Sequence, residues 1–161
     1  MEERRKIQKV RTYFLAKKET IAVAESVTSG LLQVFFSNIP DAAKFYQGGI
    51  TTYNLGQKFK HLNVEPIHAQ NHNSVSSLVA EQMAVHVCTV FNSNWGIGIT
   101  GYATPVPESG NRLYAHFAIC YQGVVKASAK LHSKKMPPAK VQNFYVERIT
   151  DQLTELLDES K

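Results

Sequence analysis

The sequence predicts a single α/β domain in which a mixed β-sheet lies between two layers of helices. The length of 161 residues fits one domain over residues 1–161, with no linker, repeat or low-complexity tract. Hydrophobic residues make up 43% of the chain and charged residues 19%, which supplies a core and excludes a disordered or coiled-coil chain. Apolar strand-like runs alternate with amphipathic helical patterns, as in three-layer α/β/α sandwiches.

The first half of the chain alternates helical and strand patterns. Apolar residues recur at helical spacing over 3–18, which predicts an amphipathic helix. A continuous apolar run over 20–24 predicts a strand covered on both faces, and a polar turn joins it to a helix that begins at Leu31. A β-branched run predicts a second strand over 48–53, and a short helix is expected over 55–62.

The middle of the chain predicts a loop, a long helix and a third strand. The Asn-rich stretch 70–74 is expected to be a loop. Apolar residues at helical spacing predict a helix over 76–91, with the hydroxyl of Ser74 or Ser76 as its N-cap. The third strand is expected over 95–100.

The end of the chain predicts a β-hairpin and a terminal helix. A Gln-Gly pair separates the extended runs 113–121 and 124–131, so these two strands should pair antiparallel. A Pro-Pro pair at 137–138 suits the start of a helix, and apolar residues at helical spacing continue that helix to Leu157.

Charge limits the partners that we expect. Lys and Arg number 18 against 13 Asp and Glu, and the formal net charge of +5 favours acidic or phosphorylated partners. The basic residues within 1–18 lack the interleaved aromatic residues of nucleic-acid-binding segments. We therefore interpret them as a solvated helix face and do not expect nucleic acid as a partner.

Cysteine content and hydropathy bear on location. Cys88 and Cys120 form neither a disulfide framework nor a Cys-x-x-Cys motif, which indicates a reduced, cytoplasmic protein. The N-terminus shows no signal-peptide pattern, and no stretch is apolar and long enough to cross a bilayer. We expect no membrane partner.

Three loops that follow predicted strands carry the candidate chemistry. In open α/β sheets, ligands bind outside the carboxyl ends of the strands, where these loops converge. The first loop, Ala-Glu-Ser-Val-Thr-Ser-Gly at 24–30, lies where a strand feeds a helix, and unpaired amides there can hold a phosphate or a developing oxyanion. The same residue types also suit a polar turn that only caps the helix.

The other two loops also allow two interpretations. The second, 53–58, contains Lys58, which can act as a general base if burial lowers its pKa by about 3 units. Lys58 can equally be a solvated lysine beside Lys60. The third loop, 100–110, is rich in Gly, Pro and small residues but lacks the P-loop pattern, so it is either a ligand-binding loop or a plain connection.

The histidines show no metal-site pattern. His68 and His72 are four residues apart, but Ala69 stands where a metalloprotease motif requires Glu, and the Asn-rich surroundings argue against a helix. His116 lies between apolar residues of a predicted strand and is interpreted as a packing or pairing residue. We expect neither a metal nor another cofactor.

Together, the three loops resemble the signatures of the C-terminal domain family of the competence-damage-inducible protein CinA, whose stand-alone members include nicotinamide-mononucleotide amidases. Residues 24–30 resemble the family's Ala-Glu-Ser-Cys-Thr-Gly-Gly, residues 47–58 its Arg-Gly-Gly-Val-Val-Thr-Tyr-Ser-Asn-Glu-Ala-Lys, and residues 100–105 its Thr-Gly-Ile-Ala-Gly-Pro. Residues 72–79 also resemble the family's Gly-Ala-Val-Ser-Glu-Glu-Val stretch. The resemblance covers about residues 4–157 and implies the α/β/α fold and self-association into a homo-oligomer.

The resemblance also implies a nucleophile and a base. Ser26 would be the nucleophile and Lys58 its base, with Tyr53 and Thr100 positioning Lys58 or the substrate. The residues that it implies in substrate binding are Glu25, Thr28, Ser29, Gly30, Gly49, Gly101, Lys134 and Lys135.

The chain departs from the family signatures at several positions. Ser29 replaces a Gly, Tyr102 and Thr104 replace Ile and Gly, and Ser-Lys-Lys at 133–135 replaces Gly-Asp-Arg. The resemblance implies an amidohydrolase that converts nicotinamide mononucleotide, a small-molecule nucleotide, to nicotinate mononucleotide and ammonia. The departures leave open a diverged, non-catalytic protein that binds a nucleotide or a protein partner. A basic accessory protein of competence or repair is a third interpretation.

Overall fold

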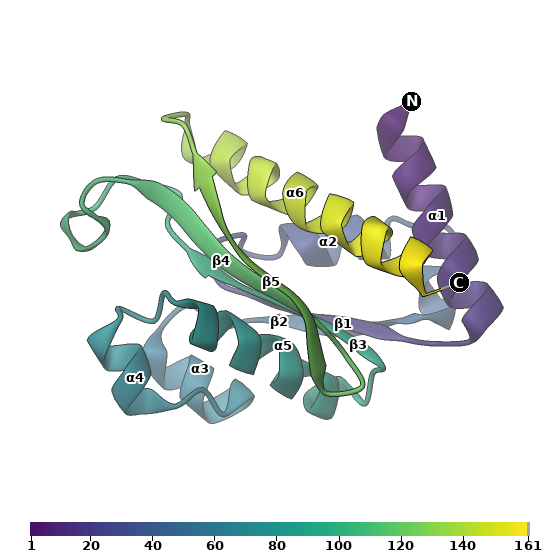
Figure 1. Cartoon of the computed structure of the whole chain (residues 1–161), viewed down its shortest axis with the longest axis horizontal. Coiled ribbons are helices and arrows are strands. Elements are labelled where there is room, and N and C mark those ends of the chain that lie inside the picture. The colour runs from purple at the N-terminus through teal and green to yellow at the C-terminus, as the bar shows by residue number, and fades with distance from the viewer. Residues whose placement is uncertain (161) are drawn as a thin grey trace.

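The computed structural model describes residues 1–160 and contains one mixed five-stranded sheet in the order β2-β1-β3-β4-β5 (Figure 1). The strands β1 (Ile21–Glu25), β2 (Tyr46–Thr51) and β3 (Trp95–Gly101) are parallel. The strand β4 (Leu113–Tyr121) runs antiparallel to β3 and forms a hairpin with β5 (Val124–Ser133). Because parallel strands end at the same edge of a sheet, the loops after β1, β2 and β3 meet there.

Helices cover both faces of the sheet (Figure 1). One layer contains α1 (Glu2–Lys17), α2 (Leu31–Ser37) and the long α6 (Pro138–Glu159). The other layer contains α3 (Leu55–Leu62), α4 (Pro66–Asn71) and α5 (Ser77–Phe91). Two short 3-10 helices, Ala42–Lys44 and Pro107–Ser109, lie in the connections.

The apolar run of β1 packs against helices on both faces of the sheet. Ile21 and Val23 belong to the core cluster on the side of α1, α2 and α6, whereas Ala22 and Ala24 belong to the cluster beneath α3, α4 and α5. All four side chains are buried. Alternation of side chains across the strand therefore gives both layers an apolar surface to pack against.

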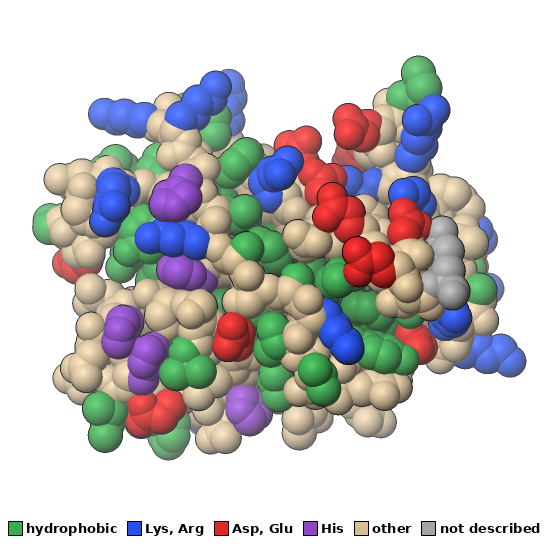
Figure 2. All heavy atoms as spheres, viewed as in Figure 1, with side chains coloured by type: hydrophobic (Ala, Val, Ile, Leu, Met, Phe, Trp, Pro, Cys, Tyr) green, Lys and Arg blue, Asp and Glu red, His purple; other side chains and the backbone are tan. Residues whose placement is uncertain are grey.

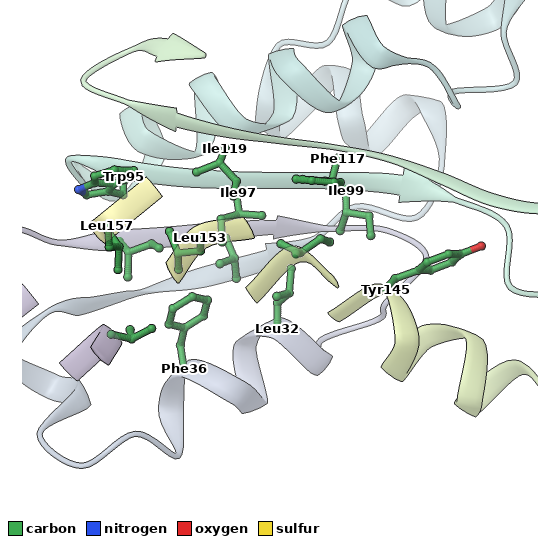
Figure 3. Close-up of a cluster of buried hydrophobic side chains, with 14 of the residues drawn as sticks. Leu32, Phe36, Trp95, Ile97, Ile99, Phe117, Ile119, Tyr145, Leu153 and Leu157 are labelled. Carbon is green, nitrogen blue, oxygen red and sulfur yellow. The ribbon is translucent and has the colours of Figure 1, made fainter. Parts of the chain in front are cut away.

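The larger core lies between the sheet and α1, α2 and α6. Figure 3 shows side chains from β3 and β4 packing toward those of α2 and α6, and its labelled members are Leu32, Phe36, Trp95, Ile97, Ile99, Phe117, Ile119, Tyr145, Leu153 and Leu157. Burying one large apolar side chain contributes about 1.5–3 kcal/mol, so this cluster is the main support of the fold and of the loops that it anchors.

The helix α5 packs unusually close to β3. A Cβ atom built on Gly96 would lie 2.2 Å from the carbonyl oxygen of Ala84, and one built on Gly98 would lie 2.3 Å from that of Ala80. These two glycines alternate along β3 and face α5, so the absence of side chains there sets the depth of α5 against the sheet.

The three-layer α/β/α sandwich with a mixed sheet is confirmed, and the antiparallel hairpin is confirmed with it. The expected loop over 70–74 is wrong at its start, because α4 extends to Asn71. The inference that His68 lies outside a helix is also wrong. Pro66 occupies the first turn of α4, and the Glu65 carboxylate accepts hydrogen bonds from the amides of Ile67 and His68.

The two cysteines, which belong to no sequence motif, lie in contact in the structure. Cys88 of α5 and Cys120 of β4 are free thiols whose Sγ atoms lie 3.3 Å apart in the buried contact between helix and sheet. Within residues 1–160, no helix is both long and apolar enough to cross a membrane, and no group of three or more His, Cys, Asp or Glu side chains is arranged to hold a metal ion.

Candidate functional site

A serine and a lysine lie in contact at the edge of the sheet where the parallel strands end. Ser26 is the first residue after β1, and Lys58 lies on α3, which follows β2. The Lys58 Nζ atom donates hydrogen bonds to the Ser26 Oγ atom at 2.9 Å and to the Thr52 carbonyl oxygen at 2.8 Å. Lys58 is only 1% exposed and Ser26 6%. The structure therefore brings together the two residues that the family resemblance implied as base and nucleophile.

Burial changes the protonation of Lys58. Loss of hydration around the ammonium form lowers the pKa of Lys58 from its usual 10.5 to about 8. No ion pair in residues 1–160 includes Lys58, so no carboxylate opposes this effect of burial. A neutral amine has a lone pair with which to accept the serine proton, and half of the Lys58 side chains reach that state at about pH 8.

Ser26 and Lys58, which we call the dyad, line a cavity of about 650 Å³. Its lining residues come from the three loops, the segment around α4, and the start of α6: Ser26, Val27, Tyr53, Asn54, Leu55, Lys58, Ala69, Gln70, Asn73, Ser74, Val75, Thr100, Gly101, Tyr102, Ala103, Thr104, Val106, Glu108, Pro138 and Gln142. Two of these lining residues, Lys58 and Glu108, are charged. We call this space the Ser26 cavity.

Glu25 and Thr28 shape the serine loop and do not line the cavity. The Glu25 carboxylate is fully buried and accepts hydrogen bonds from the Thr28 hydroxyl at 2.7 Å and from the amides of Leu32 at 2.8 Å and Gln33 at 3.1 Å. It thus satisfies amides in the first turn of α2 that have no partner within the helix. The resemblance implied both residues in substrate binding, whereas the structure engages both side chains in hydrogen bonds within the loop and with the start of α2.

Three other residues inferred to bind substrate also lie outside the cavity lining. Ser29 and Gly30 both have positive φ, 48° and 100°, and together turn the chain from β1 into α2. A Cβ atom on Gly49 would lie 2.5 Å from Cγ of Gln33, so Gly49 permits α2 to pack on β2. Gly101, which the resemblance also implied in substrate binding, lines the cavity.

Lys134 and Lys135 follow β5 and are not among the residues that line the Ser26 cavity. Lys135 lines a separate hollow at the end of the β4–β5 hairpin. The resemblance implied these two lysines in substrate binding, and the structure places neither of them in the lining of the Ser26 cavity.

Thr100 and Tyr53 line the cavity in different ways. The Thr100 hydroxyl is buried and donates to the Ser74 carbonyl oxygen at 2.6 Å, so it fixes the loop between α4 and α5. Ser74 and its neighbour Asn73 both have left-handed backbone conformations, which a loop tolerates when it is held firmly. Tyr53 is 75% exposed and stands at the cavity mouth.

Sequence reasoning missed the contribution of α6 to the site. Gln142 lines the cavity and its side-chain amide donates to the Val27 carbonyl oxygen at 2.8 Å, while the Tyr145 hydroxyl donates to the Tyr102 carbonyl oxygen at 2.8 Å. One helix thus ties the first and third loops together. The helical spacing of α6 predicted which residues face the core but not which loops its first turns would touch.

The fold and the site define an α/β/α protein with a buried Ser–Lys pair at the loop edge of its sheet. Its family follows from comparison with known sequences. The chain belongs to the CinA C-terminal domain family, whose model matches residues 3–157. The family resemblance inferred from the three loops is confirmed.

Similar proteins support this assignment. A CinA-like protein of a Picosynechococcus species is 42% identical over 89 residues, which cover 55% of this chain and 21% of the relative. A competence-damaged protein (CinA) superfamily structure from Escherichia coli is 27% identical with a TM-score of 0.87 and covers 94% of this chain and 88% of that one. A Klebsiella pneumoniae member of the superfamily has a TM-score of 0.90 at 24% identity, covers 99% of both chains, and shows a shared fold. The chain spans about a fifth to a third of the length of the curated relatives that it matches.

Proposed function

We propose that this protein is an amidohydrolase that uses Ser26 as nucleophile and Lys58 as base, and that its substrate is the nicotinamide amide of nicotinamide mononucleotide. The observation that carries the proposal is the contact between the buried Lys58 amine and the Ser26 hydroxyl in an open cavity. A hydroxyl activated by a neutral lysine is one of the known variants of the serine hydrolase arrangement.

In the first half of the reaction, Ser26 Oγ attacks the amide carbonyl carbon while Lys58 Nζ accepts the hydroxyl proton. The tetrahedral intermediate collapses when Lys58 returns that proton to the amide nitrogen, and ammonia leaves. In the second half, a water molecule loses a proton to Lys58 and attacks the ester carbonyl, and Ser26 leaves with that proton. The products are ammonia and the carboxylic acid, and Lys58 ends each cycle neutral.

Backbone amides beside Ser26 are suited to stabilise the oxyanion. Among the described residues, the amides of Val27 and Thr28 make no hydrogen bond, and Val27 lines the cavity. Preorganised donors of this kind stabilise charge that develops in the transition state, and removal of one such donor from other hydrolases slows turnover by about 10²–10³-fold.

The cavity lining also fits a cationic aromatic ring. In nicotinamide mononucleotide the pyridine nitrogen is bonded to ribose, so the ring carries a positive charge. Tyr53 and Tyr102 present aromatic rings at the cavity, and Glu108 adds a carboxylate. An aromatic face attracts a cation by about 0.5–2 kcal/mol, depending on how much water is excluded.

A second candidate function is binding without hydrolysis, of a nucleotide or of a protein partner. Two observations favour it. Ser29 keeps a positive φ of 48° at a position where the family signature has glycine. The third loop carries Tyr102, Thr104 and Glu108 at the cavity, which differs from the small, Gly-rich family pattern.

We also propose that the protein acts in the cytoplasm as a homo-oligomer with a small-molecule nucleotide as its ligand and without nucleic acid. The long edge strand β5 supports self-association, since its outer edge leaves backbone donors and acceptors without a neighbouring strand. Sedimentation of the purified protein tests the oligomeric state, and a single monomeric species would contradict this part of the proposal.

The decisive experiment incubates the purified protein with nicotinamide mononucleotide and follows ammonia release. The variants are Ser26→Ala and Lys58→Met, and the matched control is Lys60→Ala, which removes an exposed lysine from the same helix. We expect each of the first two variants to lower kcat by at least about 10³-fold and the control to stay within about twofold. Turnover that survives Ser26→Ala refutes the mechanism. A thermal shift with the mononucleotide, without turnover, supports the binding protein instead.

A further inference from the structure

A second hollow, of about 470 Å³, lies at the end of the β4–β5 hairpin, outside the Ser26 cavity. Three of its lining residues are basic, namely Arg112, His132 and Lys135. The remaining lining residues are uncharged: Pro105, Asn111, Leu113 and Ser133. No carboxylate belongs to this lining. We call this space the basic hollow.

Positive charge continues from the basic hollow along the open face of the hairpin. The strand register places Lys130 opposite His116 and His132 opposite Tyr114. The Lys130 Nζ atom lies 4.2 Å from the centroid of the Tyr114 ring, and the Arg112 guanidinium lies 5.9 Å from it. Figure 2 shows histidine and Lys or Arg side chains gathered over the hairpin, whereas most Asp and Glu side chains in this view lie over α6 and α1.

Among residues 1–160, neither Arg112, Lys130 nor Lys135 takes part in an ion pair. The ion pairs within residues 1–160 involve other basic residues, on α1, α6 and the 3-10 helix at 42–44. Burial lowers the pKa of His116, and the positive charges of Lys130 and His132 lower it further. An anion bound here would offset the positive charges of Arg112, Lys130 and Lys135.

The basic hollow and the Ser26 cavity share a wall. The segment between β3 and β4 separates them, since Thr104 lines the cavity and the next residue, Pro105, lines the hollow. The Tyr102 ring at the cavity packs edge-on against the Tyr114 ring, with centroids 5.3 Å apart. In the cavity itself Lys58 is the one lining cation, and its amine is already bonded to Ser26 and Thr52. A phosphate group therefore finds unpaired cations in the hollow and not beside the dyad.

We propose that the basic hollow binds a phosphate group, held by Arg112, Lys135 and His132, with Lys130 adding positive potential. The planar guanidinium of Arg112 presents paired donors that match phosphate oxygens, the Lys135 ammonium adds a point charge, and the His132 ring can donate an N–H. The phosphate either belongs to the substrate whose amide reacts at Ser26 or comes from a separate ligand. The first of these sources rests on the proposed amidohydrolase function, whereas the binding site itself does not.

The first arm of the test measures binding without turnover. Inorganic phosphate is titrated at constant ionic strength into isotope-labelled protein, and amide chemical shifts report saturation. We expect a dissociation constant on the order of 1 mM, with shifts centred on the end of the β4–β5 hairpin. The double variant Arg112→Ala/Lys135→Ala should weaken binding at least about tenfold, because both substitutions remove exposed cations from the hollow.

The control is Lys126→Ala, which removes one exposed lysine from the far end of the same strand. It should change the dissociation constant by less than about twofold, since the charge removed lies beyond close range of the hollow. Phosphate binding that does not saturate, or that the double variant and the control weaken equally, overturns the proposal.

The second arm identifies the source of the phosphate. It compares nicotinamide mononucleotide with its unphosphorylated riboside as substrates of the wild-type chain and the double variant. If the substrate supplies the phosphate, the double variant raises KM for the mononucleotide at least about tenfold and leaves kcat and the riboside KM unchanged. If KM is unchanged while phosphate binding is lost, the hollow serves a separate phosphate-bearing ligand. If neither amide is hydrolysed, the proposed function fails, and the titration alone decides the binding site.

Discussion

The Lys58 Nζ atom lies 2.9 Å from the Ser26 hydroxyl oxygen and 2.8 Å from the Thr52 carbonyl oxygen. The carbonyl is a fixed acceptor on the chain just after β2, so it orients the amine toward the serine. Burial of the same amine lowers the pKa of Lys58 to about 8. Orientation and protonation are thus set by different parts of the fold, and each can be tested separately.

The rate of amide hydrolysis should rise with pH through an apparent pKa near 8. Lys58 accepts a proton only when it is neutral, so below that value kcat/KM should fall about tenfold for each further unit of pH. The measurement is kcat/KM for ammonia release from about pH 6 to pH 10. Lys60→Ala should keep the same profile. A profile that stays flat between about pH 6 and pH 8 would show that Lys58 is not the base.

The depressed pKa of Lys58 also makes a prediction about stability. In the unfolded chain Lys58 returns to its usual pKa of 10.5, so between about 8 and 10.5 the unfolded state binds more protons than the folded state. The free energy of unfolding should therefore rise with pH across that window, by up to about 3 kcal/mol from this group. Below pH about 8 both states are protonated and this contribution stays constant.

Lys58→Met isolates that contribution, because Met fills a similar volume and does not titrate. Denaturant unfolding of both proteins at several pH values gives the difference in free energy, in which the effects of other groups cancel. The difference should grow in favour of the wild-type chain as pH rises from about 8 to 10.5. A difference that does not change with pH contradicts the lowered pKa.

The sequence allowed the fold class and the dyad to be predicted for separate reasons. Apolar runs such as 20–24 reveal strands buried on both faces, and a parallel order brings the loops after them to one edge. That reasoning placed Ser26 and Lys58 in the same region. Only the family resemblance singled them out as a pair, because a polar turn and a solvated lysine fit the same residue types.

The rest of the site depends on contacts that no local pattern encodes. The short helix α4 was missed because its six residues show no apolar period, although Pro66 after Glu65 is a start signal. Glu25 was implied as a substrate ligand only by the family resemblance, and the sequence does not show that its carboxylate accepts hydrogen bonds from the first turn of α2. The contacts of Gln142 and Tyr145 with the loops follow from the angle at which α6 crosses the sheet, which the spacing of its apolar residues does not give.

Glu25→Gln should destabilise the protein by about 2–4 kcal/mol. The carboxylate accepts three hydrogen bonds, from Thr28, Leu32 and Gln33. The NH₂ group of a glutamine cannot accept a hydrogen bond, so at least one of these donors would lose its partner. The substitution would also remove a negative charge of β1 that faces the first turn of α2. Urea unfolding measures the loss. The control Glu147→Gln replaces an exposed carboxylate on α6 and should change stability by less than about 0.5 kcal/mol.

Thr100→Val should raise KM and lower stability by about 1 kcal/mol. Valine keeps the shape of threonine but removes the donor to the Ser74 carbonyl oxygen, which leaves a loop of the cavity wall less firmly held. Steady-state kinetics and thermal unfolding measure the two effects. Thr104→Val removes an exposed hydroxyl from the same cavity and should leave stability unchanged. Equal effects of the two substitutions would argue against a positioning role for Thr100.

Two glycine substitutions should act in opposite directions. Gly96→Ala places a Cβ atom 2.2 Å from the Ala84 carbonyl oxygen, so α5 must move away from β3, and we expect a loss of about 1–3 kcal/mol or more. Gly56, by contrast, lies in the first turn of α3. The Cβ atom of Gly56→Ala would meet only the Asn54 Oδ1 atom, at an ordinary contact distance of 3.6 Å.

Because alanine loses less conformational freedom than glycine on entering a helix, Gly56→Ala should stabilise the protein by about 0.5–1 kcal/mol. Unfolding in urea ranks both variants against the wild-type chain. If Gly96→Ala leaves the free energy of unfolding unchanged, α5 does not lie as close to β3 as the structure shows. The placement of residues 73–75, which line the Ser26 cavity just before α5, would then also be contradicted.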